Sequence, residues 1–160
     1  MSTDIHFEIK GNAGVVTLDK QETLNAADAG GPSVTLVESD QRKAAFLREA
    51  ARAMEISVEI LSTRIENDAN LAALNGVNVV TARALARLSS LLGLVQPFIS
   101  DETVCIFMKG RDAAREIAEA RADWSFECTE HASVTDPQAK IIVVRRIVSS
   151  STAAGKVKAQ

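Results

Sequence analysis

A glutamate stands at the point where a predicted strand of this chain meets a charged helix. Residues 34–37 (VTLV) form an apolar, β-prone run that ends at Glu38, and the charged helix begins two residues later. In α/β proteins that bind nucleotides, a carboxylate at the tip of such a strand accepts hydrogen bonds from a ribose diol. An acid in an exposed loop is the alternative interpretation, because strand ends often carry acids.

Two further candidate contacts follow the next apolar runs along the chain. After the run at 58–61, backbone groups of residues 63–66 could read the edge of an adenine ring while Ile65 packs on its face. From the sequence alone, an ordinary polar loop is the simpler interpretation of this segment. Arg83 ends the next run, and Arg87 lies one helical turn further on. The two arginines could bind a carboxylate or a phosphate, and a solvated helix start is an equal alternative.

A glycine between two cations, Lys109-Gly110-Arg111, ends the fourth run. Glycine lets a backbone approach a phosphate closely, and a basic surface turn is an equal alternative. Because ligands of an open parallel sheet lie outside the carboxyl ends of its strands, the four features are expected to converge on one sheet edge. The sequence shows no nucleophile–base triad, no paired carboxylates, no P-loop and no GxGxxG motif, so no catalytic side chain is expected.

The elements that would position these residues alternate from residue 34 onward. The apolar spacing predicts strands at 34–37, 58–61, 77–81, 103–108, 126–129 and 140–147, and helices at 40–54, 69–74, 84–95 and 112–124. This alternation is typical of an α/β fold with a mainly parallel sheet. No helix separates the last two strands, which are therefore expected to form an antiparallel hairpin at the sheet edge.

The two ends of the chain follow other patterns. Residues 5–18 alternate around Gly11-Asn12 and predict a β-hairpin, and the composition changes at 26–32. The tail is rich in Ser, Ala, Gly and Lys and is expected to be disordered. The predicted organisation is an atypical segment at 1–29, an α/β domain at 30–148 and a disordered tail at 149–160.

The composition describes a globular chain with an aliphatic core. Its 160 residues are 46% hydrophobic and only 4% aromatic, and the formal net charge is −3, which argues against a generally basic nucleic-acid binder but allows a local basic patch. Cys105 and Cys128 lack CxxC spacing and are expected to be buried or incidental thiols in a reducing compartment. His6 and His131 lack metal-ligand spacing, so no metal site is expected.

No stretch of the sequence suits a membrane helix or a secretory signal. No window approaches the ~20 consecutive apolar residues that a membrane span needs. The N-terminal residues include Asp4 and Glu8 and lack the apolar region of a signal peptide. A cytoplasmic location without membrane contact is therefore expected.

Several long motifs resemble one known family, in the right order. From about residue 30 to 147 the chain resembles the bacterial small-subunit (16S) ribosomal RNA guanine-N7 methyltransferases, the RsmG family, formerly called glucose-inhibited division protein B. The matching segments are VTLVESDQRKAAFLREAARA (34–53), STRIE (62–66), VVTARALARLSSLL (79–92), FMKGRDAAREIAEARADW (107–124) and SVTDPQAKIIVVRRI (133–147). The resemblance implies a class I, Rossmann-like methyltransferase fold that binds S-adenosylmethionine.

The resemblance also implies roles for the candidate residues. Glu38 would lie beside the cofactor ribose, Ile65 and Glu66 match the adenine side, and Arg83 matches an arginine at the cofactor. The implied RNA contacts are Arg87, Lys109 and Arg111. The implied partner is 16S ribosomal RNA or the small ribosomal subunit, and a monomer is expected. Guanine N7 has a free lone pair, so a missing general base is compatible with this reaction.

The chain departs from the family in its first part. The family has an N-terminal helical region and a first strand ending in a DxGSGxGxPG-like turn, which are missing or replaced here. Residues 5–26 instead resemble the opening of crotonase-superfamily proteins, and 15–18 could fill the first-strand position with Asp19 at its end. Asn78 stands where the family commonly has an acid.

These departures leave more than one function open. The first is a methyltransferase acting on N7 of a guanine in small-subunit ribosomal RNA. The alternative is an inactive truncated or fused paralogue that retains an RNA-binding or interaction role, because the glycine-rich turn is not recognisable. A CoA-ester enzyme is suggested only by the first segment, and the crotonase catalytic core is not recognisable.

Overall fold

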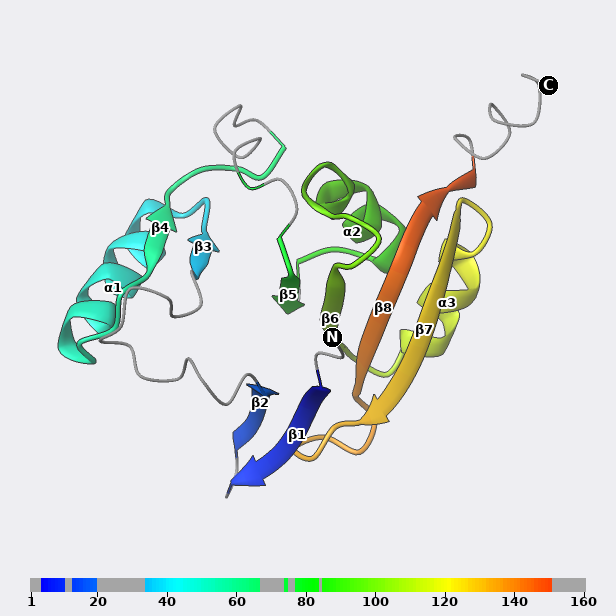
Figure 1. Cartoon of the computed structure of the whole chain (residues 1–160), viewed down its shortest axis with the longest axis horizontal. Helices are drawn as coiled ribbons and strands as arrows, with labels where there is room; N and C mark the ends of the chain where they lie inside the picture. Colours follow the sequence, from blue (N-terminus) through cyan, green and yellow to red (C-terminus); the bar gives the residue numbers. More distant parts are fainter. Residues whose placement is uncertain are drawn as a thin grey trace. The chain divides into compact units, whose positions relative to one another are not determined.

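The computed structural model describes residues 4–10, 13–19, 34–66, 74, 77–83 and 85–150. The chain divides into two compact units, 1–68 and 69–160, and each is described by itself. Figure 1 labels the helices and strands in chain order. The predicted short helix at 69–74 lies outside the described residues except for Leu74.

The first unit begins with a β-hairpin, as the alternation at 5–18 predicts. Strand β1 (Asp4–Lys10) pairs antiparallel with β2 (Ala13–Asp19) along its whole length, from Asp4 opposite Asp19 to Lys10 opposite Ala13. Among the described strands, β2 pairs only with β1. The interpretation of residues 15–18 as the first strand of the larger sheet stays a prediction, because β2 and the four-stranded sheet belong to different units.

A strand–helix–strand segment completes the first unit and confirms the predicted elements. Strand β3 (Thr35–Val37) leads into α1 (Gln41–Ala53), which returns to β4 (Glu59–Leu61), and the two strands pair in parallel. Asp40 caps the helix, because its carboxylate accepts hydrogen bonds from the amides of Arg42 at 2.8 Å and Lys43 at 3.3 Å. The helix itself consists of good helix formers without β-branched residues.

The second unit is a four-stranded mixed sheet with two contacting helices, α2 and α3 (Figure 1). Its elements are β5 (Val79–Arg83), α2 (Leu88–Val95), a 3-10 turn (Gln96–Phe98), β6 (Val104–Lys109), α3 (Ala113–Ala120), β7 (Trp124–Ala132) and β8 (Lys140–Ser149). The strand order is β5-β6-β8-β7, with β5 and β6 parallel and the other pairs antiparallel. The expected hairpin is confirmed, and β7 lies at the edge of this sheet.

Most element boundaries differ from the sequence predictions by one to four residues, and three of the differences bear on the site or the tail. Helix α2 begins at Leu88 rather than at residue 84, because Arg87 has an extended backbone (φ −62°, ψ 154°). Helix α3 ends at Ala120 rather than at 124, because the chain turns there and β7 begins at Trp124. Strand β8 continues to Ser149, where the disordered tail was expected to start.

The core of the second unit lies between the helices and the sheet. Helix α2 buries Leu88, Leu91, Leu92 and Val95, whose spacing of three and four residues forms one apolar stripe. Strand β6 is buried on both faces except at Met108, which is typical of a central parallel strand. The remaining buried members of this cluster are Cys105, Phe107, Ile117, Ala120, Phe126, Ile142 and Val144.

Trp124 packs against this core at the end of α3. The half-buried indole lies near α2, since a Cβ built at Gly93 would be 3.7 Å from the ring. Trp124 is the first residue of β7, so its indole anchors the turn between α3 and β7 against the core. The core is otherwise mainly aliphatic, as the low aromatic content implies.

Candidate functional site

Glu38 lies at the carboxyl end of β3, where the sequence analysis expects a ligand-binding carboxylate. The Glu38 amide donates to the Leu61 carbonyl at 3.0 Å, which extends the pairing of β3 with β4 by one residue. Its Oε1 accepts a hydrogen bond from the Asp40 amide at 2.8 Å, and its Oε2 lies 4.0 Å from the Lys43 ammonium. The side chain is 26% exposed, so an oriented carboxylate keeps lone pairs available for donors from a ligand.

Ile65 and Glu66 form a turn after β4, the parallel neighbour of β3. Because the carboxyl ends of parallel strands meet at one edge, the structure brings this turn and Glu38 to the same edge of the first unit. Ile65 is half-buried and Glu66 is exposed. An oriented acceptor and an apolar side chain at one strand edge suit the polar sugar and the flat base of a nucleoside.

Arg83 and Arg111 lie at the corresponding edge of the second unit. Arg83 ends β5 opposite Met108 of the parallel strand β6, and Arg111 follows the end of β6 by two residues. Both side chains are exposed and make no hydrogen bond or ion pair with another residue that the structure describes. A Cβ added to Gly110 would meet nothing within 4 Å, so the backbone there is open. That this edge meets the edge of the first unit that carries Glu38 stays a prediction.

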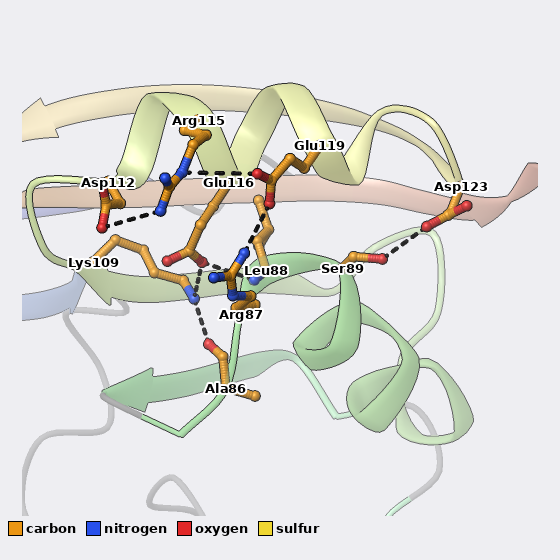
Figure 2. A network of polar contacts seen from close by, with 10 residues as sticks. All are labelled: Ala86, Arg87, Leu88, Ser89, Lys109, Asp112, Arg115, Glu116, Glu119 and Asp123. Carbon is orange, nitrogen blue, oxygen red and sulfur yellow. Dashed lines mark hydrogen bonds and ion pairs between the residues drawn. The ribbon is translucent and has the colours of Figure 1, made fainter.

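Lys109 lies in a buried environment rather than in the exposed basic turn that the sequence suggests. Its side chain is only 7% exposed, and its ammonium donates to the Ala86 carbonyl at 2.6 Å and to Glu116 Oε2 at 2.8 Å (Figure 2). The same Glu116 oxygen accepts the Leu88 amide at 2.8 Å. A buried ammonium with these partners does not support the expected direct contact between Lys109 and RNA.

Arg87 is exposed at the start of α2, and its guanidinium lies 3.3 Å from Glu119 Oε2 (Figure 2). Glu119 also lies 3.7 Å from Arg115, which contacts Asp112 at 3.4 Å. Exposed pairs of this kind contribute roughly 0–1 kcal/mol each, so the Arg87 guanidinium can leave Glu119 for another anion at little energetic cost. Arg87 therefore stays a candidate for an external anion.

Sequence reasoning missed Glu116, whose Oε2 accepts hydrogen bonds from both the Lys109 ammonium and the Leu88 amide. The available signal was an acid in the first turn of the predicted helix that follows Lys109. That signal could not show that the acid faces the start of another helix, because the Leu88 amide lies 28 positions away in the sequence.

The cysteines are not suited to nucleophilic chemistry. Burial raises the pKa of the Cys105 thiol to about 12. The pKa of Cys128 is also raised, first by burial and then by the charge of Glu130, with Arg121 opposing. Both thiols are therefore neutral near neutral pH, and the thiolate is the reactive form. Within the described segments, no group of three or more His, Cys, Asp or Glu side chains could hold a metal ion.

Solved structures share the fold of this chain. A chain of a fibrillarin/Nop5p complex matches with a TM-score of 0.56 and 11% identity, covering 71% of this chain and 61% of its own. An rRNA methylase from Streptococcus thermophilus matches with a TM-score of 0.51 and 7% identity, covering 71% of this chain and 73% of its own. At these identities the likeness concerns the fold alone, which is the Rossmann-like α/β fold of methyltransferases.

Sequence similarity assigns the chain to one family within this fold. The profile of the GidB family, described as rRNA small subunit methyltransferase G, matches residues 27–148, and the chain belongs to this family. The ribosomal RNA small subunit methyltransferase G of Paramagnetospirillum magneticum is 43% identical over 124 residues, which are 78% of this chain and 58% of that protein. That of Gluconobacter oxydans is 45% identical over 118 residues, or 74% of this chain and 59% of that protein.

The family match has two limits along the chain. It begins at residue 27, so it does not include the segment 5–26 that resembles crotonase-superfamily proteins. The chain spans a little under three fifths of the length of these relatives. The division into 1–29, 30–148 and 149–160 stays a prediction. None of the described helices is long and apolar enough to cross a membrane.

Proposed function

We propose that the chain is an S-adenosylmethionine-dependent methyltransferase that acts on N7 of a guanine in 16S ribosomal RNA. The observation that carries the proposal is the placement of Glu38. It is an oriented and partly exposed carboxylate at the carboxyl end of β3, inside the region that matches the family. This is the position at which nucleotide-binding α/β proteins hold a ribose diol.

The residues of the first unit fit the nucleoside half of S-adenosylmethionine. Glu38 Oε1 is held by the Asp40 amide, which leaves its other lone pairs to accept the two ribose hydroxyls. Ile65, half-buried at the end of the neighbouring strand, would pack on the adenine face, with Glu66 beside it. Arg83 would contact the carboxylate end of the cofactor or a phosphate of the RNA.

The proposed reaction requires the side chains mainly to hold the cofactor and the guanine in position. Bound S-adenosylmethionine supplies a methyl group on a cationic sulfur, and guanine N7 offers a free lone pair, so no proton must leave first. Holding two reactants in line contributes up to ~7–11 kcal/mol in favourable cases. We therefore assign no catalytic residue, in agreement with the neutral cysteine thiols of this chain.

The exposed cations of the second unit suit the RNA. Arg87 and Arg111 are exposed near the ends of β5 and β6. Among the described residues, their one ion pair is the weak pair of Arg87 with Glu119. Guanidinium groups bind phosphates through two parallel hydrogen bonds. The proposed partner is the small ribosomal subunit in the cytoplasm, with the chain acting as a monomer.

Calorimetric titration of the full chain with S-adenosylhomocysteine, the demethylated cofactor, tests the first step. We expect binding, and an affinity about 10- to 100-fold weaker in Glu38→Ala, because a hydrogen bond to a charged group contributes ~1.5–3 kcal/mol. Glu59→Gln is the matched control, since Glu59 is an exposed acid at the opposite end of the same two-stranded sheet. Absence of binding at millimolar ligand would overturn the proposal.

Transfer of labelled methyl groups to small ribosomal subunits tests the second step. We expect incorporation that yields 7-methylguanine after digestion of the RNA. Retention of the RNA on a filter without incorporation would refute the methyltransferase and favour a non-catalytic RNA-binding role.

A further inference from the structure

A buried polar network joins three elements of the second unit that are distant in the sequence. Lys109 at the end of β6 donates to the Ala86 carbonyl at 2.6 Å and to Glu116 Oε2 at 2.8 Å. Glu116, on α3, also accepts the Leu88 amide at 2.8 Å. Figure 2 shows the two side chains meeting at the segment that precedes α2.

The network binds the backbone on both sides of Arg87. Helix α2 starts without a side-chain cap of its own, because its N-cap residue, Arg87, makes no capping hydrogen bond. The Leu88 amide would then lack an intrahelical partner, as do all first-turn amides of a helix. Glu116 supplies that partner from another helix, while Lys109 holds the preceding carbonyl.

Burial makes this arrangement rigid. The side chains of Lys109 and Glu116 are 7% and 17% exposed, so water cannot easily replace either partner. A buried charge that loses its partner is strongly unfavourable, which disfavours any movement that separates the two groups. The segment 85–87 is therefore held between β6 and α3 by charge-assisted hydrogen bonds.

We propose that Lys109 and Glu116 are positioning residues that set the place of Arg83 and Arg87 at the ligand edge. The two arginines stand at either end of the short connection from β5 to α2, and this network binds the described backbone beside Arg87, at Ala86 and Leu88. The inference rests on the proposed function and takes Arg83 to contact the carboxylate end of the cofactor, so that cofactor affinity reports the position of Arg83. It assigns to Lys109 an indirect role in place of the direct RNA contact.

The test must separate positioning from simple stabilisation. The double variant Lys109→Met/Glu116→Leu removes both charges together, so no buried charge is left unpaired and the fold is retained. Lys109→Met/Glu116→Gln keeps an amide oxygen that can accept the Leu88 hydrogen bond. Asp123→Asn is the control, because Asp123 contacts the first turn of α2 through Ser89 Oγ at 3.1 Å without holding 85–87.

Three measurements on the full-length variants decide the question: the melting temperature, hydrogen exchange of the Leu88 amide, and calorimetric affinity for S-adenosylhomocysteine. In the Met/Leu variant we expect a nearly unchanged melting temperature and faster exchange of the Leu88 amide. We expect an affinity for S-adenosylhomocysteine about tenfold weaker, because a displaced Arg83 would lose its charged contact with the ligand. The Met/Gln variant should restore part of the protection and affinity, and Asp123→Asn should match the wild type.

Two outcomes would overturn the inference. One is an unchanged affinity in the Met/Leu variant although its Leu88 amide exchanges faster. The other is a parallel fall of affinity and melting temperature in both double variants, which a purely structural role would give. If the wild type itself fails to bind S-adenosylhomocysteine, the proposed function fails instead, and hydrogen exchange still shows whether the network holds the segment.

Discussion

The single substitution Lys109→Met should destabilise the second unit far more than a surface ion pair would suggest. Methionine keeps most of the side-chain length and removes the ammonium, which leaves the Glu116 carboxylate with the Leu88 amide as its one partner among the described residues. Breaking a buried ion pair from one side costs about 3–5 kcal/mol. Glu116 keeps 17% side-chain exposure and one hydrogen bond, so we expect about 3 kcal/mol, at the lower end of that range.

An exposed ion pair with a similar N–O distance provides the comparison. Arg52 and Glu49 lie 2.7 Å apart on α1, against 2.8 Å for the buried pair, but their side chains are 74% and 69% exposed. Removing Arg52 should cost only about 0.3–0.5 kcal/mol, because solvent screens the pair. Burial rather than distance then decides the difference between the two substitutions.

Urea unfolding measures both costs. The only tryptophan of the chain, Trp124, packs against the core of the second unit, so its fluorescence follows the unfolding of that unit. Circular dichroism at the helical wavelengths, to which α1 contributes together with α2 and α3, follows the unfolding of the Arg52 variant. The double variant Lys109→Met/Glu116→Leu should recover most of the lost stability, giving a coupling energy of about 2 kcal/mol or more. A cost below about 1 kcal/mol for Lys109→Met would refute the reasoning, because that is the value of an exposed pair.

Two further predictions concern the core. The raised pKa of Cys105 predicts that stability is fully present below pH 9.0 and is lost as the pH rises towards about 12, because only the unfolded thiol ionises in that window. The loss should reach about 1.4 kcal/mol per pH unit, and urea unfolding of Cys105→Ala should lack this part of the slope. Phe107→Ala, at a fully buried position, should cost about 3–5 kcal/mol, whereas Phe46→Ala, at 70% exposure, should change the free energy of unfolding by about 0.5 kcal/mol or less. Equal costs for the two phenylalanines would contradict the burial pattern.

The sequence predicted the elements of both units because their signals are local. The apolar run before Glu38 and the helix stripe of α1 specify a strand and a helix within a few residues, and Asp40 marks the boundary by capping. The positions of Glu38 and Arg83 at strand ends follow from the same patterns. Boundaries were less certain where no local cap exists, as at the start of α2.

The role of Lys109 could not be predicted from its neighbours. In the sequence it stands in a basic turn beside Gly110 and Arg111, which resembles a phosphate-binding segment. Only packing brings the Ala86 carbonyl, 23 positions away, within 2.6 Å of its ammonium. Arg111, two residues further on, stays exposed, so neighbouring cations of one motif have opposite environments.

The family, the order of strands and helices along the chain, and the acidic strand end at Glu38 can be read from the amino-acid sequence, because periodicity and motif are properties of short segments. Tertiary structure alone decided which charged groups are buried and which remain available to a ligand. The first amide of α2, at Leu88, is bound by Glu116, which lies 28 positions away in the sequence. The same glutamate is the partner of the buried Lys109 ammonium. Burial is a property of segments that meet in space, and no local pattern of residues contains it.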